Sequence, residues 1–406
     1  MDFLPYGRQV IEDDDIAAVA AVLRSDYLTT GPGGPAFEAA FAAAMEATHA
    51  IACSSGTAAL HLVAMALDLG PGTVSVVPSI TFLATANAVV MTGGDVVFAD
   101  VDPDTGLMTP ATLEAAIARA GRPVKAVFPV HIGGQTCDLP ALAEIAETAG
   151  AVLVDDACHA IGTRYTENGV SHAVGAGAHS VATAFSLHPV KTIAAGEGGV
   201  VTTRDPALAE KMALLRNHGM SRDAAGFTNR DLAFAPDGTA NPWYYEMQAP
   251  GLNYRLTDFQ AALVRNQLAK LPRFAATRRA IAAYYERELA ALAPLVRPVT
   301  KVEACDPVLH LYQVLIDFEA LGLSRAAVMA ELRAAAIGTQ VHYIPVHRQP
   351  FYSARHPGLD LPGADAFYEK TLSLPLSAAM TESDAARVVA ALAALCARAQ
   401  GRRPSL

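Results

Sequence analysis

Lys191 is the residue whose surroundings first suggest chemistry. It lies in a largely apolar stretch that separates two β-like runs, whereas a solvated lysine usually has polar company. A pocket of this kind lowers the pKa of a lysine amine, which a Schiff-base lysine requires. Ser186 precedes it and is well placed to hydrogen-bond a phosphate. The pair suggests an anchor for pyridoxal 5'-phosphate (PLP); the alternative for this segment alone is a lysine at a strand end that extends its amine to water.

A second candidate site is the junction formed by Ser54, Ser55, Gly56 and Thr57, which follows a strand and opens a helix. The first N–H groups of a helix lack partners within it, and together with hydroxyl groups they form an anion site. An ordinary strand–turn–helix junction capped by serine or threonine would have the same sequence. The motif therefore predicts an anion site only in combination with the neighbouring motifs.

A third candidate is a strand that ends in two carboxylates, Asp155 and Asp156, with His159 shortly after. Ligands of α/β sheets bind beyond the carboxyl ends of the strands. A carboxylate there can keep a pyridine nitrogen protonated, which makes the ring an electron sink, and His159 would then meet the ring face or its phenolate oxygen. The alternative is an aspartate that caps a helix, with His159 as an ordinary helix residue.

Composition restricts the class of protein. A chain of 406 residues exceeds the usual size of a single core and predicts two domains, and 52% hydrophobic with 17% charged residues is typical of a folded enzyme. A net charge of −10 argues against a nucleic-acid binder. We find no long apolar run, no secretory signal and no paired cysteine motif, and therefore expect a cytoplasmic protein without membrane contact. The histidines show no metal-binding spacing, so no metal is expected.

Short apolar runs alternate with helical patterns between residues 50 and 205, which predicts a mostly parallel sheet covered by helices. The expected strands are 49–53, 74–77, 95–99, 125–130, 151–155, 180–185 and 199–203. The expected helices are 57–67, 81–90, 112–120, 139–148 and 207–216. Residues 221–251 read as a long loop, and a helical run from Thr257, interrupted by Pro272, leads to a smaller domain. That domain is predicted to contain a strand at 311–318 and helices at 324–335 and 381–399.

Taken in order, these motifs resemble the DegT/DnrJ/EryC1/StrS sugar aminotransferases, which have PLP fold type I. The likeness covers nearly the whole chain. The segments that carry it are 28–32, 81–85, 186–199, 216–219, 251–258 and 373–376. It implies an α/β fold with a large α/β/α domain at 1–255, built on a mostly parallel sheet. A linking helix and a smaller C-terminal α+β domain would occupy 256–406.

The resemblance also assigns roles. Lys191, Asp156 and His159 would be catalytic: Lys191 would bind PLP covalently, Asp156 would pair with the pyridinium nitrogen, and His159 would lie near the phenolate oxygen. Phe82 would stack on the ring, and Gly56, Thr57 and Ser186 would hold the phosphate, joined by Asn253 from a second subunit. This last role implies a homodimer with shared active sites. A related branch that performs dehydration carries histidine in place of the lysine, so Lys191 favours transamination.

A finer resemblance points to the pseudaminic-acid branch of the family. It rests on segments 5–9, 25–32, 130–138, 245–248 and 341–350. The implied reaction moves an amino group from L-glutamate to carbon 4 of UDP-2-acetamido-2,6-dideoxy-β-L-arabino-hex-4-ulose, a nucleotide-linked 4-keto-6-deoxy sugar. One departure is Ile132 and Gly133, where an aromatic residue and alanine are expected. The alternatives are another nucleotide-sugar aminotransferase, such as a GDP-perosamine-type enzyme, and, from a different class, a non-catalytic PLP-binding regulator.

Five residues are candidates for contact with the substrate. Arg8 and Arg230 offer cations to a pyrophosphate, although a solvated arginine is the simpler interpretation of each. Tyr343 and His347 would line a sugar pocket, or alternatively pack between the domains. Thr30 belongs to the N-terminal motif that carries the resemblance.

Overall fold

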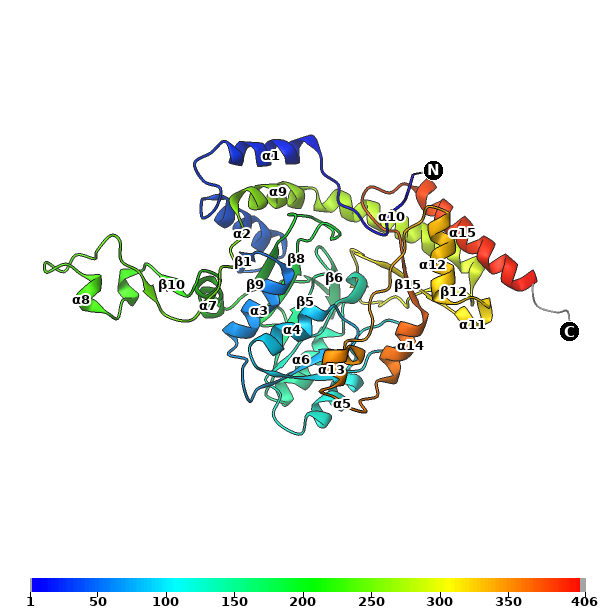
Figure 1. Ribbon diagram of the computed structural model, residues 1–406, viewed down its shortest axis with the longest axis horizontal. Coiled ribbons are helices and arrows are strands. Elements are labelled where there is room, and N and C mark those ends of the chain that lie inside the picture. The colour runs from blue at the N-terminus through cyan, green and yellow to red at the C-terminus, as the bar shows by residue number, and fades with distance from the viewer. Residues whose placement is uncertain (1, 402–406) are drawn as a thin grey trace.

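The computed structural model describes residues 2–401 and contains a large α/β body with a second, smaller core beside it (Figure 1). The body is built on a seven-stranded sheet in the order β1-β9-β8-β5-β4-β2-β3. Its strands are β1 (His49–Cys53), β2 (Val74–Pro78), β3 (Asp95–Ala99), β4 (Ala126–Val127), β5 (Val152–Asp156), β8 (Ala182–Ser186) and β9 (Gly199–Thr203).

The sheet is mostly parallel, as the sequence predicts, and only β9 runs against its neighbours β1 and β8. Every expected strand is present, but β4 is much shorter than the expected 125–130. Pro129 has no N–H to donate, so the regular ladder stops before it, and only an isolated bridge joins Val130 to Asp156.

Helices cover the sheet, and most begin with a side-chain cap. They are α3 (Gly56–Ala66), α4 (Leu83–Met91), α5 (Pro110–Ala120), α6 (Leu139–Thr148) and α7 (Pro206–Arg216). Ser55 caps α3 by accepting a hydrogen bond of 3.0 Å from the Ala58 N–H. Thr109 caps α5, whose first residue is Pro110. These caps fix where each helix starts relative to the preceding strand.

Two N-terminal helices, α1 (Asp13–Leu23) and α2 (Gly33–Ala44), were not expected from the sequence. Both pack against α9 (Asp258–Ala269), which lies more than 200 positions later in the chain (Figure 1). Two side-chain hydrogen bonds tie the turn before α2 to α9, because the buried Asp258 carboxylate accepts from the N–H groups of Gly31 and Gly33 at 2.8 and 2.7 Å.

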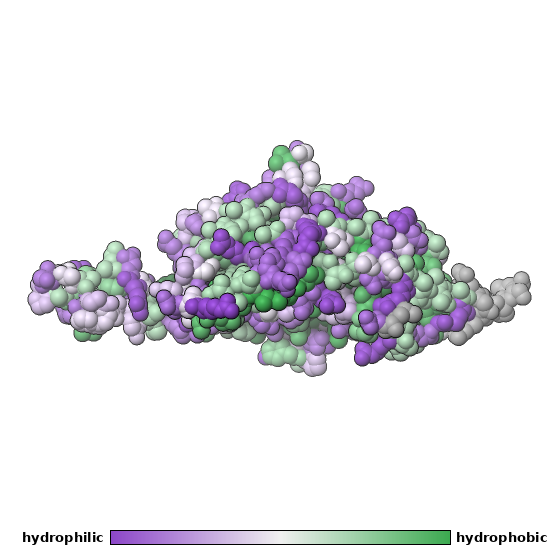
Figure 2. Space-filling view, turned by 90° about the horizontal axis from the view of Figure 1, so that it is seen from above, coloured by the Kyte–Doolittle hydropathy of each residue, from purple (hydrophilic) through white to green (hydrophobic). Residues whose placement is uncertain are grey.

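Residues 221–250 form an arm that projects from the body (Figures 1 and 2). The expectation of a plain loop is wrong in part, because the arm contains short elements: β10 (Met220–Ser221), η2 (Ala224–Gly226), α8 (Arg230–Ala233) and β11 (Glu246–Met247). Glu246 organises it by accepting hydrogen bonds from the N–H groups of Thr228 and Asn229 and from the Tyr244 hydroxyl. These bonds hold residues 228–229 against residues 244–246, beside the packed rings of Phe227 and Tyr244.

The expected long helix after Thr257 is interrupted as predicted, and the break falls at Lys270. This residue ends α9 and precedes α10 (Leu271–Leu289), with Pro272 in the first turn of α10. Ile281 and Tyr285 of α10 belong to the second core. The other elements around that core are η3 (Ala290–Leu292), β12 (Val296–Pro298), β14 (Tyr312–Ile316), α11 (Phe318–Leu321), α12 (Arg325–Ala334), β15 (Thr371–Leu374) and α15 (Glu382–Gly401).

The remaining elements pack mainly against the larger core. They are η1 (Ile132–Gly134), the hairpin β6 (Arg164–Glu167) and β7 (Val170–Ala173) with β13 (Cys305–Asp306), and η4 (Val346–Arg348), α13 (Pro350–Ser353) and α14 (Pro362–Lys370). Within residues 2–401, none of the helices combines the length and the apolar character needed to cross a membrane.

Candidate active site

A cavity of about 610 Å³ opens at the carboxyl ends of β5 and β8, beside the first turn of α3. It is the place where the expected cofactor residues from distant segments meet. Those on its lining are Gly56, Thr57, Phe82, Asp156, His159, Ser186 and Lys191, together with Tyr343 from the expected substrate set. The volume suits a ligand of the size of a cofactor with part of a substrate.

Lys191 follows β8 in an irregular turn that begins with His188, whose carbonyl accepts the Lys191 N–H at 2.9 Å. Burial lowers the pKa of the Lys191 amine to about 8, from 10.5 for an ordinary lysine. The amine is therefore neutral in about a tenth of molecules at pH 7, far more often than an ordinary lysine. That is the form that attacks a carbonyl carbon.

The first turn of α3 makes one end of the cavity an anion site. The N–H groups of Gly56 and Thr57 have no hydrogen-bond partner among the described residues, and the buried Ser186 hydroxyl lies beside them. A Cβ at Gly56 would lie 2.8 Å from the Ser186 Cβ, so only glycine allows this close approach. Free N–H groups, a hydroxyl and the positive end of a helix together fit a phosphate group.

Asp156, the last residue of β5, also lines the cavity, and both of its carboxylate oxygens are held by hydrogen bonds. The Thr85 hydroxyl donates to Oδ2 at 2.6 Å, and the Cys158 N–H donates to Oδ1 at 3.1 Å. Thr81 in turn lies 2.7 Å from Thr85 through their hydroxyl oxygens. The carboxylate is thus fixed in a buried position where it can receive a protonated ring nitrogen.

His159 is buried and neutral. Burial, and after it the charge of Lys191, lowers its pKa well below the ordinary value. The Gly133 N–H lies 3.2 Å from its Nδ1, which must therefore act as an acceptor, and the hydrogen of the neutral ring is assigned to Nε2. Nε2 faces the Tyr343 hydroxyl at 3.1 Å. The imidazole can therefore offer a hydrogen bond toward an oxygen in the cavity.

Aromatic side chains form the outer walls. The ring of Phe82, which is 55% exposed, lies 5.8 Å from that of Tyr343. Tyr6 and His342 also line the cavity, with their rings 5.4 Å apart. The sequence analysis assigned no role to Tyr6 or His342, although both belong to segments that carry the finer resemblance.

The other expected residues lie away from this cavity. Arg8 and Thr30 are exposed, and Arg230 lies in the arm over the Phe234 ring. His347 is buried outside the cavity lining, and its Nδ1 lies 2.6 Å from the Ser79 hydroxyl. It therefore contributes to packing and not to the lining of the cavity. Asn253 is exposed and pairs with Asn217 through the backbone.

The departure at Ile132 and Gly133 also lies outside the lining of this cavity. Both residues border a separate cavity of about 260 Å³ between η1 and α10. Gly133 has φ +69°, and a Cβ there would lie 2.8 Å from the Gln313 Oε1. Gly133 is connected to the main cavity through its N–H, which donates to His159.

The fold and the placement of the lysine at the strand ends define the class: the large mostly parallel sheet with its smaller second core is the architecture of PLP fold type I enzymes. The chain belongs to the DegT/DnrJ/EryC1/StrS aminotransferase family, whose profile matches residues 9–393. It is a sugar aminotransferase of that family.

Three relatives illustrate the likeness. The spore coat polysaccharide biosynthesis protein SpsC of Bacillus subtilis (strain 168) is 38% identical over 393 residues, which cover 96% of each chain. The structure of Helicobacter pylori PseC, an aminotransferase involved in the biosynthesis of pseudaminic acid, has a TM-score of 0.86 at 26% identity and covers 98% of this chain and 100% of that one. The PLP form of the putative sugar aminotransferase Spr1654 of Streptococcus pneumoniae has a TM-score of 0.84 at 25% identity, with coverage of 98% and 99%.

Proposed function

We propose that this protein is a PLP-dependent aminotransferase that moves an amino group from L-glutamate to carbon 4 of a nucleotide-linked 4-keto-6-deoxy sugar. The observation that carries the proposal is the meeting of three groups in one cavity: the Lys191 amine, the Asp156 carboxylate and the phosphate-binding first turn of α3. A solved relative that carries PLP supports the same cofactor here.

The residues present fit that cofactor. Gly56, Thr57 and Ser186 would hold its phosphate, Asp156 its ring nitrogen, and Phe82 one face of its ring. When bound, PLP supplies an aldehyde that joins amines covalently and a ring that takes up electrons from the adjoining carbon. Asp156 would pair with the protonated ring nitrogen, because two donors hold its carboxylate in place.

The chain's own groups perform the proton transfers. Lys191 has a lowered pKa, so its amine can accept a proton and return it within the working range of pH. The Gly133 N–H keeps His159 in the tautomer with the hydrogen on Nε2, and this Nε2–H donates to the Tyr343 hydroxyl on the cavity wall. Phe82 and Tyr343 limit the access of water from the outer side.

We propose UDP-2-acetamido-2,6-dideoxy-β-L-arabino-hex-4-ulose as the amino acceptor. This rests on the likeness to PseC and on the segments that carry the finer resemblance. A GDP-linked 4-keto sugar, as for a GDP-perosamine-type enzyme, is the competing acceptor.

We further propose a homodimer with shared active sites. Asn253 is exposed and does not line the cavity of its own chain, so its proposed contact with the phosphate needs a second subunit. The arm exposes large apolar side chains that water does not favour: Leu232 (63%), Trp243 (72%), Tyr245 (53%) and Met247 (70%).

The test is a reaction of the purified PLP-loaded protein with L-glutamate and a panel of UDP- and GDP-linked 4-keto sugars, with the products identified by mass spectrometry and NMR. We expect a 4-amino sugar from the UDP-linked acceptor and 2-oxoglutarate from the donor. Lys191→Ala should abolish both products. Turnover by that variant at the normal rate would refute the assignment, and a preference for the GDP-linked sugar would move the protein to the competing acceptor.

A further inference from the structure

The chain segment before α1 passes along the active-site cavity. We call residues 4–12 the N-terminal strap. At its start, the Leu4 N–H donates to the Ala336 carbonyl at 2.9 Å, and the Gly338 N–H donates back to the Leu4 carbonyl at 2.7 Å. Next along the strap, Tyr6 lies on the cavity lining. The strap is therefore one wall of the site, attached at this end to the small core.

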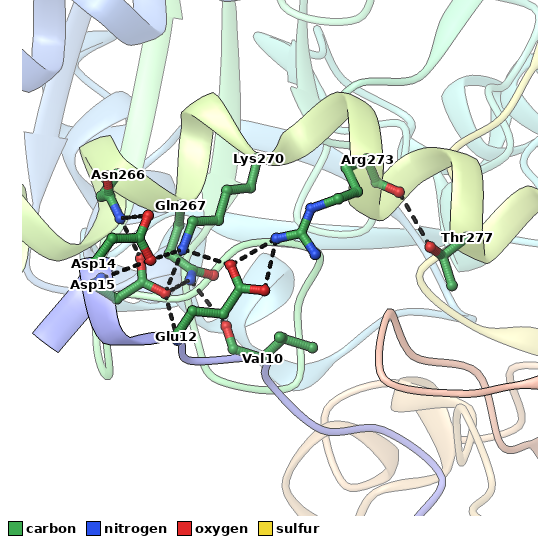
Figure 3. Close-up of polar contacts among 9 residues, drawn as sticks. All are labelled: Val10, Glu12, Asp14, Asp15, Asn266, Gln267, Lys270, Arg273 and Thr277. Carbon is green, nitrogen blue, oxygen red and sulfur yellow. Dashed lines mark hydrogen bonds and ion pairs between the residues drawn. The ribbon is translucent and has the colours of Figure 1, made fainter.

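The far end of the strap is fastened by one lysine (Figure 3). The Lys270 ammonium lies 2.9 Å from the Glu12 carboxylate, 2.6 Å from that of Asp14 and 2.9 Å from that of Asp15. Only 10% of the Lys270 side chain is exposed, and Asp15 is fully buried. Burial alone would lower the pKa of Lys270, but its hydrogen bonds to the three carboxylates raise it above the ordinary value. The ammonium is therefore fully charged at neutral pH.

Neighbouring side chains complete this fastening (Figure 3). Gln267 donates to the Val10 carbonyl at 2.9 Å, Asn266 donates to Asp15 at 2.7 Å, and Arg273 donates to Glu12 at 2.6 Å. The three clustered carboxylates are the kind of group that can hold a metal ion, but the ammonium already occupies the space between them. The cluster is therefore a clamp rather than a metal site.

The position of Lys270 explains why the clamp that it forms with Glu12, Asp14 and Asp15 can connect the strap to both cores. It is the single residue between α9, which packs on α1 and α2, and α10, which enters the second core. The strap thus begins on the small core and ends at the junction of the two cores. Loosening either end would release the same wall of the cavity.

We propose that Lys270 is a positioning residue for the sugar end of the active site, acting through the strap and Tyr6. The inference rests on the proposed function. Tyr6 packs beside His342, on the side of the cavity that also carries Tyr343. Glutamate is the smaller substrate and reacts beside Lys191, so it does not need this wall, whereas a nucleotide sugar must fill the outer space.

The experiment uses the full-length, PLP-loaded enzyme and follows the two half-reactions separately. For Lys270→Ala we expect the KM for the 4-keto sugar to rise on the order of tenfold, with the rate of the glutamate half-reaction within about twofold of the unmodified protein. Lys270→Arg should restore most of the loss, because it keeps the charge and can reach the same carboxylates. Lys211→Ala is the matched control, since Lys211 also pairs with a carboxylate at 2.6 Å but lies on α7.

A second variant tests the other end of the strap. A Cβ at Gly338 would lie 3.2 Å from both the Leu4 carbonyl oxygen and the Pro5 Cα, so Gly338→Ala should displace the strap without removing a charge. Hydrogen exchange of the amides of Leu4 and Gly338 should accelerate in both variants while the amides of β5 stay protected. This measurement also reveals a variant that has simply unfolded.

The outcomes are separable. An unchanged KM for the sugar in both strap variants would overturn the inference and leave the proposed function standing. Unchanged exchange of the strap amides in Lys270→Ala would overturn it as well. Failure of the unmodified protein to react with glutamate would instead refute the proposed function, and the exchange measurement would still decide whether Lys270 holds the strap.

Discussion

At the scale of single residues, the site depends on a few side chains whose ordinary properties are changed by burial. Lys191 and His159 both have lowered pKa values because the cavity removes water from them. Hydroxyl and amide donors hold the Asp156 carboxylate in position without any ligand. Each of these effects leads to a measurable consequence.

The lowered pKa of Lys191 predicts how fast the apoprotein takes up PLP. Because the neutral amine attacks the aldehyde, the second-order rate of uptake should rise with pH and level off above about pH 8. An ordinary lysine would give a rate that still rises beyond pH 10. Stopped-flow absorbance measures this profile, and a plateau only near pH 10 would contradict a buried amine.

Thr85 predicts a positioning effect on Asp156. Thr85→Val keeps the shape of the side chain but removes the donor to Oδ2, so kcat should fall on the order of tenfold with a smaller change in KM. Thr85→Ser should recover most of the rate. Thr92→Val, at the end of the same helix, removes a hydroxyl that bonds only a backbone carbonyl and serves as the control. Equal rates for Thr85→Val and the control would show that the hydroxyl is not needed.

At the scale of elements, short side chains at the start of a helix determine how closely that helix approaches the neighbouring strand and the ligand site between them. The first turn of α3 approaches β8 so closely that a single methyl group between them is excluded. The same turn provides the free N–H groups of the anion site. The strand and the helix therefore have to keep a fixed distance for the site to exist.

Gly56→Ala tests this spacing. The new Cβ would lie 2.8 Å from the Ser186 Cβ, so α3 should shift away and the affinity for PLP should fall on the order of tenfold. Gly34→Ala is the control, because Gly34 also lies in the first turn of a helix and its Cβ would meet nothing within 4 Å. Fluorescence titration of the two apoproteins with PLP compares them; equal dissociation constants would disprove the crowding argument.

At the scale of the whole molecule, the proposed homodimer would complete each active site with the exposed Asn253 of a second subunit. If Lys191 and Asn253 of one site come from different subunits, two inactive variants can complement each other. Within a symmetric dimer each heterodimer then contains one intact site and one site that lacks both residues.

Mixing Lys191→Ala and Asn253→Ala subunits at equal amounts, after reversible dissociation, should therefore recover about one quarter of the unmodified activity, since half of the dimers are heterodimers with one intact site. Each variant alone should be nearly inactive. Analytical ultracentrifugation should show a dimer in every sample. Activity that stays at the level of the separate variants would show that the sites are not shared.

The sequence by itself determined the family, the mostly parallel sheet and the candidate roles of Lys191, Asp156 and Gly56. These signals are local: apolar runs mark buried strands, and motif residues lie within a few positions of a strand end. The break in the helical run near Pro272 was foreseen for the same reason, because proline acts on its own turn. The division of the domains at residue 255 and the shared site at Asn253 stay predictions.

Only the tertiary structure decided which residues from distant segments meet. The bond from Thr85 to Asp156 joins residues 71 positions apart, and the bond from Lys270 to Asp15 joins residues 255 positions apart. Tyr6 likewise reaches a cavity wall built from distant segments, and no local pattern encodes such pairs. His347 lies off the main cavity, where it contacts Ser79, and Ile132 borders a separate cavity. Burial and close packing act through space rather than along the chain, and for that reason the folded arrangement had to supply them.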